Sequence, residues 1–284
     1  MNKIKKENPN VLKKDQKKDN KTKIIKLGSI QIKTSKSDLI ALAILIIVVI
    51  ASFLSPKAFL ITTGRYGQGT KEDNKNVITA LGKENTEERF EIYFQWYNVL
   101  HEIGHGVITY NGERNMSSAE EEQLVNDFAV AYWLYYGEEE KISELIDIAN
   151  YASKNIKSDA KEGTNYLKYA EDNWKKPSFN TFNNYGWFQF NAVKHSLDEK
   201  KSLEEVLKEM GVEDFKIPER KVLEYPDITE KVSTKIINDA IDNIHEWGLD
   251  FPKTYQIFSD NPNTNNSRSL RNTFGIISLI DKLS

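Results

Sequence analysis

The chain contains no cysteine among its 284 residues and only four histidines. The absence of cysteine excludes disulfide bonds and thiolate ligands for zinc. Any metal ion bound by this chain must therefore be held by histidine and carboxylate side chains. The formal net charge is −3, so the chain as a whole lacks the excess of positive charge that is typical of nucleic-acid-binding proteins.

Two of the four histidines lie four residues apart, in the run His101-Glu102-Ile103-Gly104-His105. Residues i and i+4 of a helix share a face, so both imidazoles can reach one metal ion. Glu102 is turned just enough to meet a water molecule bound to that ion. This H-E-x-x-H spacing predicts a helical zinc site.

Positive charge is concentrated at the N-terminus. The first 36 residues hold twelve lysines against three acidic residues, with few apolar residues before Ile24. Such a stretch cannot build a hydrophobic core, so we expect residues 1–38 to form a disordered tail. The chain as a whole shows no internal repeat.

An uncharged, apolar run follows at residues 39–56, and it is long enough for a membrane-spanning helix. No clean Ala-x-Ala site follows it, and the basic leader is long for a signal peptide, so we expect a retained anchor. The lysines before it place the tail in the cytoplasm and the chain beyond about residue 57 outside a bacterial cell membrane. The reverse topology would make the remainder a cytoplasmic domain.

Residues 57–284 are expected to form one domain with a mainly α fold. Short apolar stretches at 58–63 and 77–81 predict a small N-terminal sheet, separated by a polar stretch that contains glycine. Apolar periodicity and capping residues predict helices at 86–107, 120–136, 141–156, 164–174, 182–197, 202–210, 234–247 and 270–283. Residues 216–227 and 260–267 have the composition of loops.

Capping residues support two of these helices. Thr86 is the expected N-cap of the helix that carries the histidines, with acidic residues in its first turn. Ser118 and Glu121 have the spacing of a capping box, which would start the next helix.

A hydrolytic zinc site needs three protein ligands and a water molecule, so two histidines are not sufficient. The helix after the turn at Asn111 returns antiparallel and carries Glu120, Glu121, Glu122 and Asp127. Glu120 and Glu121 lie in its first turn, where acidic residues favour the helix dipole. Glu122 lies on a side that can face inward, which favours it as the third ligand, with Asp127 or Glu121 as the alternatives.

Residues 100–108 and 122–129 resemble the gluzincin-type metallopeptidases, which include the HtpX-like and the ImmA/IrrE-like proteases. Their pattern is H-E-[LI]-G-H…E-x-x-A-[DN]-x-F-A, and the chain departs from it at Val125, where the pattern has alanine. The match covers about thirty residues. It implies a zincin-like α+β domain in which Glu122 is the third zinc ligand and Asn126 supports the site.

The residues and the resemblance together predict a membrane-anchored zinc metallopeptidase that acts on a peptide or protein substrate. His101, His105 and Glu122 are expected to bind Zn²⁺. Glu102 is expected to act as the general base, which takes a proton from the metal-bound water and delivers it to the leaving amine.

Stabilisation of the developing oxyanion requires a further hydrogen-bond donor. The candidates are His195, Tyr185 and Arg268. A lone histidine on an aromatic helix is more often a core residue, and the aromatic run at 185–190 is more often core than the lining of a substrate cleft.

Two other functions remain open. One is a membrane-anchored interaction or sensor protein whose zinc is structural or whose site is inactive, but a structural zinc does not need Glu102. The other is a cell-wall hydrolase, although the soluble part shows neither binding repeats nor a basic wall-binding face. The lysine-rich tail can bind anionic lipid head groups, but the topogenic charge of an anchor is the favoured explanation.

Overall fold

The computed structural model describes residues 23–27, 30–34, 61, 66–67, 69–112, 115–219, 221–226, 228 and 230–252, to which all structural statements refer. It has two compact units, residues 1–58 and residues 59–284. The predicted anchor at 39–56, the loop at 260–267 and the helix at 270–283 lie outside the described residues. Among the helices described, none combines the length and the apolar composition needed to cross a membrane.

The first unit contains a β-hairpin. Strands β1 (Lys23–Leu27) and β2 (Ile30–Thr34) are antiparallel, with Leu27 opposite Ile30. Both strands lie within residues 1–38, which were expected to form a disordered tail. β-Branched isoleucines are frequent in both segments and favour extended backbone.

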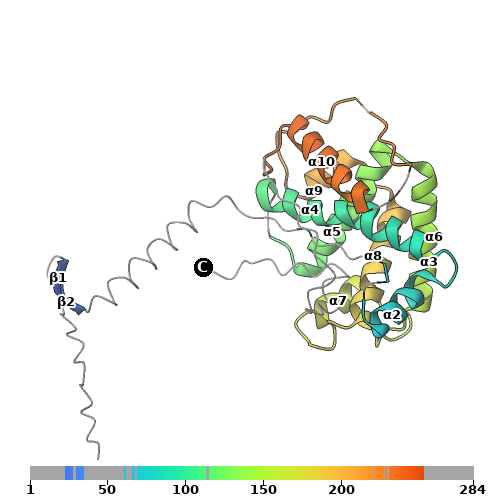
Figure 1. Cartoon of the computed structure of the whole chain (residues 1–284), viewed down its shortest axis with the longest axis horizontal. Helices are drawn as coiled ribbons and strands as arrows, with labels where there is room; N and C mark the ends of the chain where they lie inside the picture. The colour runs from blue at the N-terminus through green and yellow to red at the C-terminus, as the bar shows by residue number, and fades with distance from the viewer. Residues whose placement is uncertain are drawn as a thin grey trace, which may run out of the picture. The chain divides into compact units, whose positions relative to one another are not determined.

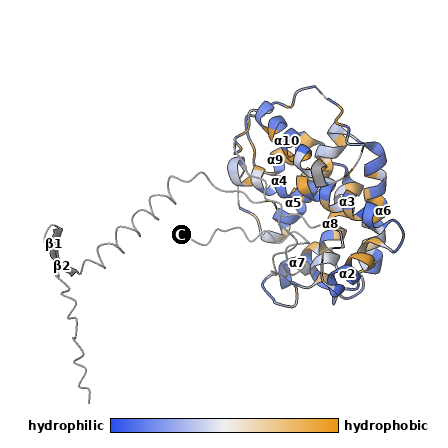
Figure 2. Ribbon diagram, in the orientation of Figure 1, coloured by the Kyte–Doolittle hydropathy of each residue, from blue (hydrophilic) through white to orange (hydrophobic). Residues whose placement is uncertain are grey.

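The second unit is mainly helical, as expected, and no strand occurs among its described residues (Figure 1). Its elements are α2 (Lys71–Leu81), α3 (Thr86–Glu91), the π-helix η1 (Ile92–Tyr97), α4 (Asn98–Asn111), α5 (Ser118–Tyr136), α6 (Glu139–Asn155), α7 (Tyr166–Asn173), the π-helix η2 (Phe182–Gly186), α8 (Trp187–Glu199), α9 (Leu203–Glu209) and α10 (Glu230–Glu246). Hydrophilic and hydrophobic residues share the same helices in Figure 2, as amphipathic packing requires.

The small N-terminal sheet predicted at 58–63 and 77–81 is not found in the described residues. Residues 77–81 belong instead to helix α2. That helix begins with a capping box in which the side chain of Thr70 accepts from the backbone N–H of Asp73, and the Asp73 carboxylate accepts from that of Thr70. Val77, Ala80 and Leu81 then repeat at helical spacing and are buried.

The predicted helix at 86–107 is present as the continuous run α3–η1–α4, although Thr86 is not its N-cap. Asn85 takes that position with a left-handed φ of 52°, and the Thr86 hydroxyl donates to the carbonyl of Gly82 at 2.7 Å. The π-helical segment η1 is buried throughout. A π turn holds an additional residue, which changes the direction of the side chains that follow, and such turns are frequent at functional sites.

Aromatic side chains fill the core beside these helices. Trp96 of η1 stacks on Trp133 of α5, with ring centroids 4.3 Å apart and planes inclined by 16°. Helix α4 packs against α5, and α5 packs against α8 and α9. The two helices that carry the candidate metal ligands therefore lie in the interior, where neighbouring helices hold them rigidly.

Gly104 lies at a close contact between α4 and α5. A Cβ atom on this residue would lie 3.0 Å from the Cβ atom of Val125 and 3.1 Å from Cδ1 of Phe128. A larger residue would force these neighbours to move by a few tenths of an ångström. Glycine at this position therefore permits the contact that brings the histidine face of α4 to the acidic face of α5.

Candidate metal centre

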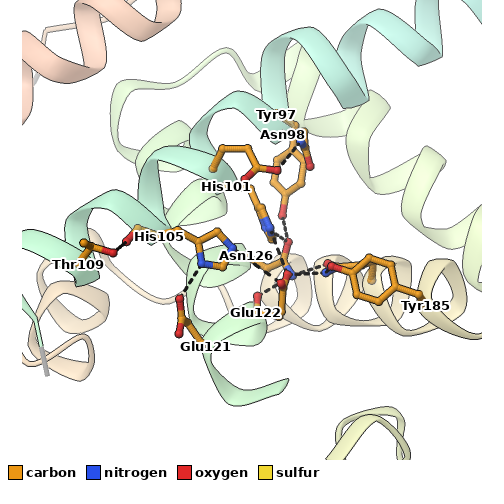
Figure 3. A network of polar contacts seen from close by, with 11 residues as sticks. Tyr97, Asn98, His101, His105, Thr109, Glu121, Glu122, Asn126 and Tyr185 are labelled. Carbon is orange, nitrogen blue, oxygen red and sulfur yellow. Dashed lines mark hydrogen bonds and ion pairs between the residues drawn. The ribbon is translucent and has the colours of Figure 1, made fainter. Parts of the chain in front are cut away.

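His101 and His105 lie on one face of α4, with ring centroids 5.2 Å apart and planes inclined by 82°. Both are buried. Figure 3 shows both rings pointing from α4 toward Glu122 on α5. The i, i+4 spacing has the consequence expected from the sequence, since both imidazoles reach one point between the helices.

Each histidine uses Nδ1 for a hydrogen bond to α5. Nδ1 of His101 lies 2.9 Å from Oδ1 of Asn126, and Nδ1 of His105 lies 2.8 Å from Oε1 of Glu121. Oδ1 of Asn126 is the acceptor, because its Nδ2 donates to the carbonyl of Glu122 at 2.8 Å. Both Nδ1 atoms therefore carry a proton, which leaves both Nε2 atoms available as metal ligands.

Glu122 lies opposite these two Nε2 atoms. Its Oε2 atom is 3.3 Å from Nε2 of His101, and its Oε1 atom is 3.8 Å from Nε2 of His105. In a tetrahedral site with bonds of about 2.0–2.1 Å, neighbouring ligand atoms are about 3.4 Å apart. The contact of Glu122 with His101 has about this separation, whereas its contact with His105 is longer and is made by the other carboxylate oxygen.

Glu102 lies beside the same centre. His101, Glu102 and His105 can each place one ligand atom within 4.8 Å of the other two, so this buried group can hold a metal ion. The group includes Glu102 rather than Glu122, but Glu122 is the carboxylate that lies across from both Nε2 atoms.

The two oxygens of Glu102 differ in their surroundings. Oε1 accepts a hydrogen bond from Nδ2 of Asn98 at 3.2 Å, whereas Oε2 is buried without a hydrogen-bond partner among the described residues. A buried carboxylate oxygen without a partner destabilises the fold, unless a bound group such as a water molecule satisfies it. This unsatisfied oxygen fits a centre that holds a metal ion and its water.

The two carboxylates have opposite pKa shifts. Burial raises the pKa of Glu102, and this effect outweighs the lowering by His101 and His105. Burial also acts to raise the pKa of Glu122, but hydrogen bonds and charges from His101, His105 and Gln189 hold it below its usual value. Glu122 is thus suited to remain a charged ligand, and Glu102 to exchange a proton.

Glu121 has a role that the sequence analysis did not foresee. The capping box of α5 is formed by Ser117 and Glu120, one residue earlier than the predicted pair of Ser118 and Glu121. Glu121 is therefore not used for capping, and it orients His105 instead. The sequence signal was ambiguous, because both serines are followed three residues later by a glutamate.

Asp127, an alternative third ligand, faces away from the histidines. Its Oδ1 atom accepts from Oγ of Ser196 at 2.5 Å, and its Oδ2 atom lies 3.0 Å from Nζ of Lys201. These contacts connect α5 to α8 and to the segment before α9. Asp127 is thus a buried structural carboxylate.

Of the three residues predicted as candidates for oxyanion stabilisation, one lies at the candidate metal centre. Tyr185 joins the centre, since its hydroxyl accepts a hydrogen bond from Nε2 of Gln189 at 2.7 Å (Figure 3). His195 lies with its ring 5.9 Å from that of Tyr166, and no hydrogen bond to the metal-centre residues is found in the described part of the chain. Arg268 lies outside the described residues.

Gln189 is the residue of the centre that the sequence analysis missed. It lies within the aromatic run at 185–190, where no pattern distinguishes it. It reaches Glu122 across 67 positions of sequence, so only the packing of α8 against α5 reveals the contact.

No family model, curated protein or solved structure matches the chain significantly. The resemblance to gluzincin-type metallopeptidases therefore depends on residues 100–108 and 122–129 alone.

Proposed function

We propose that this chain is a zinc-dependent metallopeptidase that hydrolyses peptide bonds with Glu102 as the general base. The observation that carries the proposal is the meeting of the Nε2 atoms of His101 and His105 with Glu122, beside an unpartnered oxygen of Glu102. Two histidines and one carboxylate are a ligand set of hydrolytic zinc sites, which leave one position open to water.

When bound, zinc would lower the pKa of a coordinated water molecule and polarise the carbonyl of the scissile bond. Glu102 then supplies the proton transfer. Asn98 holds its Oε1 atom, which leaves Oε2 to accept a proton from water and to return it to the leaving amine. The raised pKa of Glu102 favours acceptance of a proton from water.

Tyr185 is the best-placed donor for the developing oxyanion. Burial raises the pKa of its phenol far above the usual value, and the charges of Glu122 and Glu102 act in the same direction. The hydroxyl therefore stays protonated. Because it accepts from Gln189, its own proton is available for a substrate oxygen. These observations favour Tyr185 over His195.

The proposed setting follows from the sequence alone. Residues 39–56 would anchor the enzyme in a bacterial cell membrane, with the lysine-rich tail in the cytoplasm and the catalytic domain outside. The substrate would then be a peptide or protein at the outer face of the membrane.

One observation favours a second function, in which the metal is structural and the chain is a membrane-anchored interaction or sensor protein. His101, Glu102, His105 and Glu122 are each at most 8% exposed, and structural zinc sites are closed in this way. The peptidase is preferred because a structural site has no use for the unpaired oxygen of Glu102.

The substitution Glu102→Gln distinguishes these functions. It keeps the shape of the side chain and removes the base, so zinc content should be unchanged while cleavage of a general peptide substrate falls by roughly 10²–10⁴-fold. Glu204→Gln is the matched control, because Glu204 lies on the surface in an ion pair with Lys208.

Zinc content is measured by atomic absorption, and cleavage is measured with and without a chelator. Cleavage by the Glu102→Gln variant at the native rate would refute the proposed base. A wild-type chain that binds zinc but cleaves no member of a peptide library would support the structural alternative.

A further inference from the structure

Gln189, near the start of α8, is hydrogen-bonded to three side chains of the metal centre. Its Nε2 atom donates to Oε2 of Glu122 at 2.5 Å and to the hydroxyl of Tyr185 at 2.7 Å. Its Oε1 atom accepts from Nδ2 of Asn126 at 3.1 Å. Both amide hydrogens and the amide oxygen are used, so the buried side chain has one orientation only.

This bonding makes the two oxygens of Glu122 unequal. Oε2 accepts a charge-assisted hydrogen bond from Gln189 and lies 3.3 Å from Nε2 of His101. Oε1 has no contact with Gln189 and lies on the side of His105, 3.8 Å from its Nε2 atom. A carboxylate that binds a metal through both oxygens occupies two coordination positions. A carboxylate that is held at one oxygen by an amide binds the metal through the other oxygen and leaves a position for water.

We propose that Gln189 is a positioning residue that restricts Glu122 to coordination of the metal through Oε1. The inference rests on the proposed function as far as the metal ion is concerned, and it does not depend on peptide cleavage. Gln189 also joins the metal ligand to Tyr185, so one amide sets the distance between the metal and the proposed oxyanion donor.

The chain offers a matched control in Gln123, which is also buried and also links α5 to α8. Its Nε2 atom donates to Asp127 at 2.8 Å and to Ser196 at 2.9 Å, and its Oε1 atom accepts from Tyr166 at 2.7 Å. Gln123 therefore makes the same number of side-chain bonds without touching a proposed ligand.

The experiment compares Gln189→Met with Gln123→Met. Methionine keeps the length of the side chain and removes both donors. Zinc affinity is measured by competition with a chromophoric chelator, and coordination is measured by the visible absorption of the cobalt(II)-loaded protein. Gln189→Met should weaken zinc binding by about 10–100-fold. The visible absorption of the cobalt(II)-loaded variant should also weaken, as expected when a four-coordinate ion becomes five-coordinate.

Gln123→Met should lower thermal stability while zinc affinity and the cobalt spectrum stay at wild-type values. Circular dichroism reports whether each variant is folded. If Gln189→Met does not fold, Gln189→Asn replaces it, because asparagine keeps the amide but is one methylene too short to reach Glu122. The same changes in zinc affinity and cobalt spectrum are then expected.

A folded Gln189 variant with wild-type zinc affinity and an unchanged cobalt spectrum would overturn the inference. A wild-type chain that binds neither zinc nor cobalt would overturn both the inference and the metal site. A wild-type chain that binds metal without cleaving peptides, together with the expected shift in Gln189→Met, would refute the peptidase and leave the role of Gln189 established.

Discussion

Gly104 of α4 lies against Val125 of α5, and a Cβ atom on Gly104 would lie only 3.0 Å from the Cβ atom of Val125. His101 precedes Gly104 by three residues, and Glu122 precedes Val125 by three residues. The contact between the helices and the separation of His101 from Glu122 are therefore linked, since each of these residues is about one turn from the contact.

The first prediction follows from this contact. Gly104→Ala should weaken zinc binding by about tenfold or more, because the new Cβ atom pushes Glu122 away from the histidines. The change in stability should be small, since alanine gains about 1 kcal/mol of helix propensity against about 1–3 kcal/mol of overpacking. Chelator competition and urea unfolding measure the two quantities.

The double variant Gly104→Ala with Val125→Gly is its control. Removing the Cβ atom and the methyl groups of Val125 makes space for the new Cβ atom, so zinc affinity should recover part of the way toward the wild-type value. If Gly104→Ala alone binds zinc as tightly as the wild type, the contact does not set the ligand separation.

The second prediction separates two adjacent glutamates of α5. Glu121→Ala should weaken zinc binding by about 10–100-fold, because Nδ1 of His105 loses its acceptor and the ring loses its orientation. Glu120→Ala should leave zinc affinity unchanged and lower the stability by about 0.5–1 kcal/mol, because Glu120 takes part in the capping box with Ser117.

Zinc titration and urea unfolding of both variants test this pair. Equal losses of zinc affinity in the two variants would mean that both acidic residues of this turn contribute alike through their charge. The long-range field of the helix N-terminus would then explain the effect better than the contact with His105.

These two glutamates also show where prediction from sequence reaches its limit. The mainly helical fold, the shared face of His101 and His105 and the inward position of Glu122 follow from periodicity along one segment. The register of the capping box does not, because Ser117 and Ser118 have equivalent spacing to a glutamate. Only the packing of α5 against α4 selects Ser117 and places Glu121 beside His105.

Two other differences between the sequence prediction and the structure have similar causes. Residues 77–81 form a short apolar run that fits a strand or a helix, and the capping box at Thr70 decides for the helix. Gln189 reaches Glu122 through contacts between helices that are distant in sequence, which no local pattern encodes. Local chemistry was thus predictable, whereas the long-range hydrogen bonds that orient the ligands were not.

The third prediction concerns pH. Burial lowers the pKa of His105, but the hydrogen bond to Glu121 and the charges of Glu122 and Glu102 outweigh it, so the pKa rises from 6.5 to about 9. A raised histidine pKa stabilises the metal-free fold fully below about pH 6.5, and this contribution is lost as the pH rises through about 9. Its full size is on the order of 3 kcal/mol.

Urea unfolding in the presence of a chelator, at pH values from about 6 to 9.5, measures this contribution. Glu121→Gln should flatten the dependence, because it removes the hydrogen bond to a charged acceptor that raises the pKa of His105. With zinc bound, the same decline should be absent, since a coordinated imidazole is not protonated. A metal-free chain with constant stability across this range would contradict the prediction.

The fourth prediction distinguishes the proposed ligand from its buried neighbour on α5. Glu122→Ala should lose zinc on dialysis, because two histidines alone leave the site incomplete. Asp127→Ala should keep zinc but lose roughly 3 kcal/mol of stability, because it removes a buried carboxylate that accepts from Gln123, Ser196 and Lys201. Metal analysis after dialysis and urea unfolding separate the two effects.

The two carboxylates are five residues apart on one helix and both are buried, so a general loss of structure would affect them alike. The prediction is therefore one of opposite patterns: metal loss with modest destabilisation for Glu122→Ala, and destabilisation with full metal content for Asp127→Ala. A folded Asp127→Ala variant that loses zinc, beside a Glu122→Ala variant that keeps it, would exchange the two roles. The separation of Asp127 from the histidines argues against that exchange, because its two oxygens already bind Ser196 and Lys201.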